Sequence, residues 1–166
     1  DDDGETLDTG VTGHVQVRGE SVFKAYWRKP DKTREAFTAD GWFRTGDDGH
    51  FDAEGYLTLV GRGKDLIITG GLNVYPSEVE TVLDALPGIG ESAVIGLPHA
   101  DFGEQVVAVL VLTPGAPFDD AATRLAVRQQ LAAYKQPKQY LIADALPRNA
   151  MGKVQKNLLR ERYGTA

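Results

Sequence analysis

The amino-acid sequence predicts an α+β protein in which a small β-rich segment, residues 1–62, precedes a compact mixed α+β domain, residues 63–166. Three observations lead to this prediction. The early part alternates apolar and polar residues in short runs, as half-buried strands do. The later part sets strand-like apolar runs between stretches with helical spacing. A glycine-rich stretch, GRGKDLIITGG at 61–71, marks the change between the two patterns.

The first segment is expected to be mainly β. HVQVRG at 14–19 alternates like a strand, and HFDAEGYLTLVGR at 50–62 is typical of two extended pieces around a tight DAEG turn. The polar and aromatic residues between them leave room for one short helix. We expect Trp27 and Trp42 to pack inside this segment.

The second segment is expected to alternate strands and helices. A strand at 65–69 precedes an amphipathic helix that enters at Pro76, and Ser77 and Glu80 have the spacing of a capping box. The remaining elements, in chain order, are strands at 91–97 and 105–112, a helix at about 119–133, a strand at 138–144 and a closing helix at 154–163.

Composition excludes several classes of chemistry. The 166 residues contain no cysteine, which rules out disulfides, thiolate nucleophiles and cysteine-based zinc sites, and three scattered histidines predict no metal site. A formal net charge of −6 argues against a nucleic-acid partner. The apolar runs are too short to span a bilayer and no leader is recognisable, so we expect no membrane contact and a cytoplasmic location.

The first stretch with possible chemistry is WFRTGDDG at 42–49, in which Asp47 follows a glycine. Asp47 can be a turn residue that bonds its own backbone. Alternatively, its carboxylate can accept hydrogen bonds from two vicinal hydroxyls, as acidic residues do for ribose in nucleotide sites. Both interpretations fit this stretch taken alone.

The second stretch, GRGKD at 61–65, places Arg62, Lys64 and Asp65 together at the change of pattern. A solvated, charged linker is the plain interpretation. The flanking glycines instead indicate unusual dihedral angles or close approach of the backbone to another group. The spacing of a Walker loop is absent, so a bound phosphate would be held in another way.

The third stretch, PRNAMGKVQK at 147–156, places Lys153 after Gly152 on a polar turn. A surface salt bridge or a contact at the end of a helix is the ordinary role of a single lysine. An active role would be electrostatic, because a flexible cation can reach oxygens whose negative charge grows during acyl or phosphoryl transfer.

Taken together, the order and spacing of these stretches resemble the adenylate-forming superfamily, which includes acyl-CoA synthetases, the adenylation domains of peptide synthetases and firefly luciferase. RTGD at 44–47 is similar to its ribose-binding aspartate motif, and GRGKD at 61–65 is similar to its domain hinge. GGLNVYPSEVE at 70–80 is similar to the loop and helix after the hinge, and PRNAMGK at 147–153 to the catalytic-lysine motif.

The resemblance implies an acid–thiol ligase that uses ATP to activate a small carboxylic acid as acyl-AMP, releases pyrophosphate, and transfers the acyl group to CoA. Asp47 and Arg62 would hold the ribose hydroxyls of the nucleotide, and Lys153 would contact carboxylate and phosphate oxygens during adenylation. Mg²⁺ would accompany ATP and be bound mainly by an N-terminal domain that this sequence lacks.

The same resemblance implies a moving domain. Residues 1–62 would be the β-rich tail of the large adenylation domain, and residues 63–166 a mobile C-terminal lid that alternates between the two half-reactions. Lys64 would be the hinge residue, and Gly70, Gly71 and Leu72 would line the channel for the pantetheine arm of CoA.

The motifs look most like those of malonyl-CoA synthetases, which implies malonate or methylmalonate as the acid. Nothing here resembles the phosphate loop or the acyl pocket of the family, and the chain opens on aspartate, so we expect a part of a longer protein that is inactive alone. The alternative is a non-catalytic binding or lid module. Lys153 also has the exposure expected of a target of protein lysine acetyltransferases, which makes such an enzyme a further expected partner.

Overall fold

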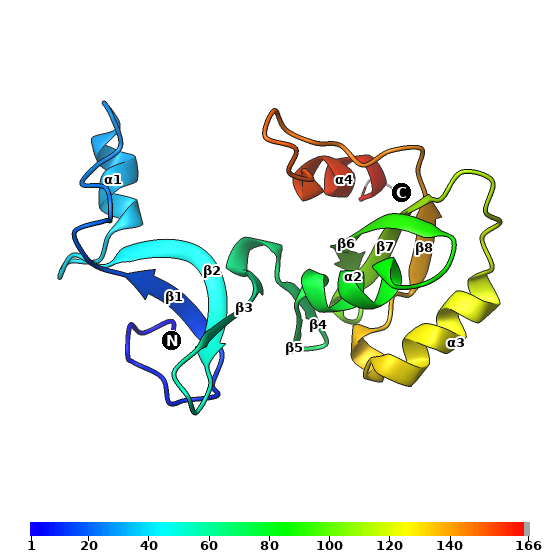
Figure 1. Cartoon of the computed structure of the whole chain (residues 1–166), viewed down its shortest axis with the longest axis horizontal. Coiled ribbons are helices and arrows are strands. Elements are labelled where there is room, and N and C mark those ends of the chain that lie inside the picture. The colour runs from blue at the N-terminus through cyan, green and yellow to red at the C-terminus, as the bar shows by residue number, and fades with distance from the viewer. Residues whose placement is uncertain (165–166) are drawn as a thin grey trace. The chain divides into compact units, whose positions relative to one another are not determined.

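The computed structural model describes residues 1–164 and divides the chain into two compact units, Asp1–Lys64 and Asp65–Ala166 (Figure 1). The boundary between the units follows Lys64, whereas the sequence pattern placed the change after Arg62. Both units mix helices with sheet, so the predicted α+β class is confirmed. No helix within residues 1–164 is both long and apolar enough to cross a bilayer.

The first unit is built on a three-stranded antiparallel sheet of order β1-β2-β3. Its strands pair as the alternation predicted, and the expected hairpin of β2 and β3 turns at Asp52, whose carboxylate accepts a hydrogen bond from the backbone of Tyr56 at 2.8 Å. The elements of this unit are β1 (Gly13–Val17), α1 (Pro30–Ala36), β2 (Phe43–Phe51) and β3 (Leu57–Arg62).

Aromatic side chains pack beside this sheet. Phe23 contacts the rings of Phe37 and Phe43 at centroid distances of 5.6 and 5.0 Å. Trp42 lies under the guanidinium of Arg18, 4.5 Å from the ring centroid. Trp27 is 84% exposed, so the prediction that it packs inside the segment is wrong. Arg28 beside it has a φ of 54°, in the left-handed region that residues other than glycine rarely adopt.

The second unit is built on a five-stranded sheet of order β5-β4-β7-β6, in which β8 pairs in parallel with β7. All other pairs are antiparallel. The strands are β4 (Ile67–Thr69), β5 (Leu72–Val74), β6 (Ile89–His99), β7 (Gly103–Leu112) and β8 (Gln139–Ile142). The helices are α2 (Pro76–Asp84), α3 (Asp120–Gln130) and α4 (Lys156–Tyr163), with 3₁₀ turns at η1 (Gly63–Asp65) and η2 (Ala133–Lys135).

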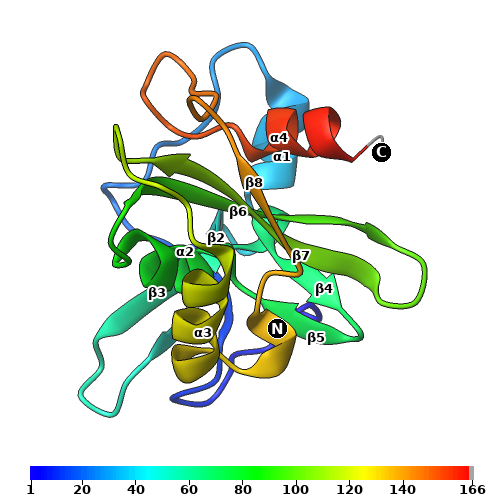
Figure 2. The ribbon, with the colours of Figure 1, turned by 90° about the vertical axis from the view of Figure 1, so that its right-hand side faces the viewer.

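The core of the second unit lies on both faces of β6 and β7. Alternate residues of these strands enter two buried clusters, one shared with α2 and α3 and the other with α4. Figure 2 shows α4 on one side of the β6–β7 pair and α2 with α3 on the other. Because both faces are covered, the strands are almost continuously apolar, which explains runs such as VVAVLVL.

The capping box predicted for this unit is wrong. The helix α2 has Tyr75 at its N-cap and no side-chain capping bond, so Ser77 and Glu80 do not form a capping box. Glu80 instead accepts a hydrogen bond from the backbone of Val94 on β6 at 2.7 Å, because tertiary contacts offer it a buried donor. The helix expected at about 119–133 is confirmed as α3, although it ends earlier, at Gln130, and η2 follows it.

Candidate active site

Asp47 and Arg62 meet across the β2–β3 hairpin. The strand register pairs the two residues, and Arg62 Nε donates to Asp47 Oδ1 at 3.1 Å. Their side chains are 29% and 47% exposed, so both remain accessible from outside the first unit. The backbone of Asp47 is fixed by a hydrogen bond from its N–H to Thr45 Oγ1 at 3.1 Å, while that hydroxyl donates to Val15 O at 2.8 Å.

This arrangement suits a vicinal diol. A carboxylate that receives one guanidinium bond keeps lone pairs on its second oxygen for a hydroxyl donor, and the adjacent guanidinium N–H groups can donate to a hydroxyl oxygen. The pair is largely formed before any ligand binds, so little ordering would be needed on binding. The ribose role of Asp47 and Arg62 stays a prediction.

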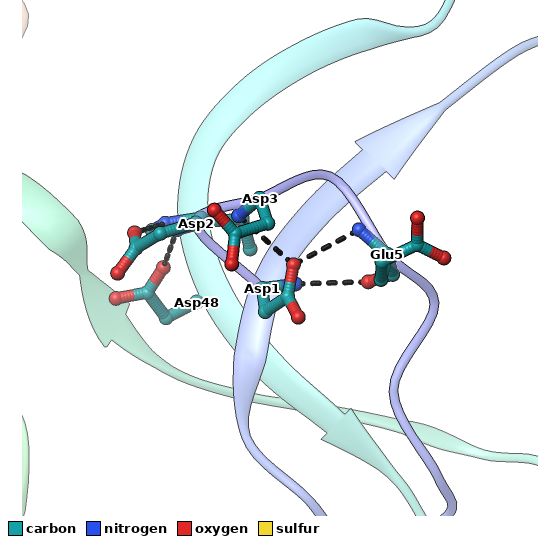
Figure 3. Close-up of polar contacts among 6 residues, drawn as sticks. Asp1, Asp2, Asp3, Glu5 and Asp48 are labelled. Carbon is teal, nitrogen blue, oxygen red and sulfur yellow. Dashed lines mark hydrogen bonds and ion pairs between the residues drawn. The ribbon is translucent and has the colours of Figure 1, made fainter.

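A buried carboxylate lies next to this pair, although the local sequence pattern indicates no role for it. Asp48 is 3% exposed, and its Oδ1 lies 2.8 Å from His14 Nδ1 on β1. Figure 3 shows Asp48 beneath the N-terminal acidic run, where His14 Nε2 is also 2.9 Å from Asp2 Oδ1. The hydrogen bonds to Asp2 and then Asp48 raise the pKa of His14 above its ordinary value. In the sequence, the second aspartate of RTGDD at 44–48 is the feature that could have drawn attention to Asp48.

The residues of the predicted hinge form the 3₁₀ turn η1. Lys64 is exposed at the end of the first unit. Asp65 begins the second unit, where Arg160 of α4 donates to its Oδ1 at 3.0 Å. The side chains of this pair are 30% and 20% exposed, so solvent screens the interaction only in part. The helix α4 is therefore tied to the first residue of its own unit.

Gly70 and Gly71 form a two-residue turn between β4 and β5 that the sequence analysis did not recognise as a hairpin. Thr69 pairs with Leu72, and the two glycines have φ values of +58° and +79°, as a type I′ turn requires. Gly70 N–H donates to Phe102 O at 2.9 Å, and a Cβ on Gly70 would lie 3.4 Å from the Phe102 ring. Leu72 is 48% exposed beside the turn.

Lys153 ends a tight loop whose backbone is fixed by one asparagine. Asn149 Oδ1 accepts hydrogen bonds from the N–H groups of Met151 at 2.9 Å and Lys153 at 3.0 Å. The backbones of Asn149 and Gly152 close the loop with two further bonds of 2.9 Å, and Gly152 has a φ of +78°. The Lys153 side chain is exposed, and its ammonium makes no hydrogen bond or ion pair with residues 1–164.

Two ionic contacts hold the loop and the helix after it. Arg148 donates to Gly152 O at 2.7 Å and pairs with Glu91 of β6. On α4, Lys156 Nζ lies 2.7 Å from Glu80 Oε1 of α2. Both ends of the loop are thus attached to the sheet and its helices, while the lysine between them stays free to bind an external group.

The structure brings the predicted residues together in two groups. Asp47 and Arg62 are in direct contact within the first unit, and Gly70, Gly71 and Leu72 share one turn of the second. Among the residues that the structure describes, no three histidine, aspartate or glutamate side chains are grouped to hold a metal ion.

Comparison with known proteins identifies the type of domain. Residues 78–153 match the family described as AMP-binding enzyme C-terminal domain. This chain carries the C-terminal domain of an adenylate-forming enzyme. The domain belongs to the acyl-CoA synthetase superfamily, and its relatives include sulfoacetate–CoA ligase and long-chain-fatty-acid–CoA ligase FadD13.

Three relatives show how far the similarity extends. The domain and its preceding unit are 45% identical over 154 residues to sulfoacetate–CoA ligase of Cupriavidus necator, across 93% of this chain and 30% of that enzyme. The crystal structure of ATP-bound MatB from Rhodopseudomonas palustris matches with a TM-score of 0.88 and 55% identity, covering 96% of this chain and 32% of MatB. The o-succinylbenzoate CoA synthetase MenE from Bacillus subtilis, solved with the acyl-adenylate OSB-AMP, matches with a TM-score of 0.90 and 37% identity. The match covers 95% of this chain and 32% of MenE.

The chain spans about a third of the length of these relatives. Further curated relatives include indoleacetate–CoA ligase of Aromatoleum aromaticum, 45% identical, and feruloyl-CoA synthase of an Amycolatopsis species, 42% identical. Sulfoacetate–CoA ligase and these two curated relatives are named as CoA ligases or synthases, and each name gives a different acyl group.

Proposed function

We propose that this chain is part of an ATP-dependent acyl-CoA synthetase that converts a small carboxylic acid into acyl-AMP and then into acyl-CoA. In the first step, the carboxylate oxygen bonds to the α-phosphorus of ATP and pyrophosphate leaves. In the second, the thiol of CoA loses its proton and its sulfur bonds to the acyl carbon, while the bond from that carbon to the phosphate oxygen breaks and AMP leaves. The chain alone is expected to be inactive, because its sequence contains no recognisable phosphate loop or acyl pocket.

The observation that carries the proposal is the state of Lys153. Its backbone is held by Asn149 and its ammonium has no partner within residues 1–164. A fixed loop around a free cation has no evident structural use, but it suits the stabilisation of negative charge on carboxylate and phosphate oxygens. We assign Lys153 to the first step only.

The other residues are assigned by the same reasoning. Asp47 and Arg62 bind the ribose hydroxyls, because they form a preorganised pair of acceptor and donors. Lys64 is the hinge residue. Gly70, Gly71 and Leu72 line the path of the pantetheine arm of CoA in the second step, where the bare glycine backbone allows a close approach.

The proposed acid is malonate or methylmalonate. Similarity of the hinge and lysine motifs to malonyl-CoA synthetases and the 55% identity to MatB support this choice. A cytoplasmic location follows from the sequence prediction and remains part of the proposal. The comparisons do not support an acetyltransferase partner, which stays a sequence prediction.

The test uses a chimera in which this chain is joined to the part of Rhodopseudomonas palustris MatB that it does not cover. ATP–pyrophosphate exchange reports the first step, and thioester formation from supplied acyl-adenylate reports the second. Lys153→Ala should abolish exchange and spare thioester formation. Lys138→Ala, a change at another exposed lysine of the same unit, should leave both rates unchanged.

Equal loss of both steps in Lys153→Ala would refute the assignment of this lysine to adenylation. Exchange by the isolated chain would refute the claim that it needs a larger partner domain. Because the MatB part would select the acid in the chimera, malonate, methylmalonate and acetate have to be compared by pyrophosphate release in the longer natural enzyme.

A further inference from the structure

The buried carboxylate of Asp48 is adjacent to the proposed ribose site but has no role in it. Asp47 and Asp48 are neighbours on β2, so their side chains point to opposite faces of the strand. Asp47 is accessible, whereas Asp48 is 3% exposed. Burying a carboxylate without polar partners costs free energy. The contacts of Asp48 therefore indicate which groups compensate for its burial and which part of the chain it stabilises.

Asp48 connects β1 to the strand that leads into the hinge turn. Its Oδ1 lies 2.8 Å from His14 Nδ1. On its other side it faces Gly63, where an added Cβ would lie 3.5 Å from Oδ2 and 3.6 Å from Oδ1. The register pairs Asp48 with Gly61 on β3. The carboxylate therefore lies against the short backbone segment that carries Arg62.

His14 is the titratable group whose charge can change how firmly Asp48 is held against residues 61–63. The charged and polar groups that face it are Asp48 and Asp2. The Asp2 side chain is 98% exposed and that of Asp48 is 5% exposed, so the bond to Asp48 is the one shielded from water. Imidazolium adds an ion pair to the hydrogen bond that it donates to the Asp48 carboxylate, so this bond is stronger than the one that neutral imidazole can donate.

We propose that His14 is a positioning residue which, through the buried carboxylate of Asp48, sets the backbone of residues 61–63 and thereby the placement of Arg62 and Lys64. The contact is a property of this chain, and its effect on catalysis rests on the proposed function. The segment is held most tightly when His14 is protonated. The raised pKa of His14 extends this state toward neutral pH.

The first test is an NMR titration of the 166-residue chain between about pH 5 and pH 8.5, the range in which histidine titrates. The amide signals of Arg62, Gly63 and Lys64 should shift with the same midpoint as the His14 imidazole. In His14→Asn, whose carboxamide can still donate to Asp48 but does not titrate, these shifts should disappear in a folded protein. His99→Asn, in the second unit, should leave them unchanged.

Amide signals of residues 62–64 that stay constant while His14 titrates would overturn the proposal. So would a titration of these signals that persists in His14→Asn. His14→Leu removes the donor altogether, and it can unfold the first unit because Asp48 would be buried without this partner. The titration of the His14→Asn variant is therefore the test that decides for or against the proposal.

The second test measures the effect on catalysis in the MatB chimera. Loss of a hydrogen bond to a charged group corresponds to a change of about tenfold. His14→Leu should raise the KM for ATP about tenfold with a smaller change in kcat, and His14→Asn should restore most of the loss. An unchanged KM for ATP in an active chimera would refute the catalytic effect. An inactive wild-type chimera would count against the proposed function, whereas the titration would still decide whether His14 positions the hinge.

Discussion

Replacement of Glu80 by alanine tests whether one carboxylate holds the second unit together. Glu80 Oε1 accepts a hydrogen bond from the Val94 N–H at 2.7 Å and lies 2.7 Å from Lys156 Nζ. Strand β6 is at the edge of its sheet, so this N–H has no neighbouring strand to bond. Glu80 therefore joins α2 to β6 and to α4, the helix that follows the Lys153 loop.

The expected cost of Glu80→Ala is about 3 kcal/mol in the free energy of unfolding. Val94 is fully buried, and leaving its N–H without this acceptor costs about 1–3 kcal/mol. The side chains of Glu80 and Lys156 are 19% and 16% exposed, so losing their ion pair adds about 1 kcal/mol. Glu80→Gln retains an acceptor oxygen and should cost about 1 kcal/mol, mainly for the lost charge.

Urea unfolding can measure the loss of stability in the second unit alone, because the two units carry different spectroscopic probes. Trp27 and Trp42 are the chain's tryptophans and both belong to the first unit, whereas α2, α3 and α4 belong to the second. Far-ultraviolet circular dichroism should show a midpoint lower by about 1.5 M in Glu80→Ala, for a slope of about 2 kcal/mol per M. Tryptophan fluorescence should keep the wild-type midpoint.

Asp84→Ala is the matched control, because Asp84 is an exposed acid on the same helix. It should change the free energy of unfolding by less than about 0.5 kcal/mol. Equal losses in Glu80→Ala and Glu80→Gln would show that the acceptor oxygen is not what matters. A loss below about 1 kcal/mol in Glu80→Ala would refute the reasoning from the buried N–H.

Three further changes test the loop, the turn and the histidine. Asn149→Ala removes the acceptor shared by the N–H groups of Met151 and Lys153, so ATP–pyrophosphate exchange in the MatB chimera should fall about tenfold while the urea midpoint changes little. Gly71→Ala places a side chain at a φ of +79° and should destabilise the second unit by about 1 kcal/mol in urea unfolding followed by circular dichroism. The pKa of His14 is raised in the folded state, so its contribution to stability is complete below about pH 6.5 and is lost as the pH rises through the folded pKa. Urea unfolding followed by tryptophan fluorescence should therefore show a less stable first unit at about pH 8.5 than at about pH 5.5.

Each of these expectations has its own control. Asn149→Asp keeps a carboxyl oxygen in the loop and should retain more exchange activity than the alanine variant. Gly71→Asn should cost less than Gly71→Ala, because asparagine tolerates positive φ better. His14→Asn should remove the part of the pH dependence that belongs to this histidine. A first unit that becomes more stable as the pH rises in this range would contradict the sign of the His14 effect.

Local patterns predicted most elements because those elements are long or strongly periodic. The strands β6 and β7 were recognised from continuous apolar runs, and α4 from its helical spacing. The strand β5 was missed, because three residues show no period and the Gly70–Gly71 turn had been interpreted only as a loop. The capping box at Ser77 failed because a buried backbone N–H on another strand bonds Glu80 instead.

The residues of the candidate site also divide into those that local motifs predict and those that only tertiary contacts reveal. Asp47, Arg62 and Lys153 could be picked out from short motifs, because each lies in a local stretch with glycine or charged neighbours in the sequence. His14 could not, since its partner Asp48 lies 34 residues away and meets it only when β1 pairs with β2. Nor could any pattern show that Arg160 reaches Asp65, 95 residues earlier in the chain.

The sequence by itself determined the α+β class, the order of the motifs and the residue types of the proposed site, because these depend on periodicity, spacing and side-chain chemistry. Only the tertiary structure decided which charges are paired and which are left free. Asp47 holds Arg62, Asp48 holds His14 and Glu80 holds Lys156, whereas the Lys153 ammonium has no partner within residues 1–164. Pairing depends on distances between residues far apart in the chain, and folding sets those distances.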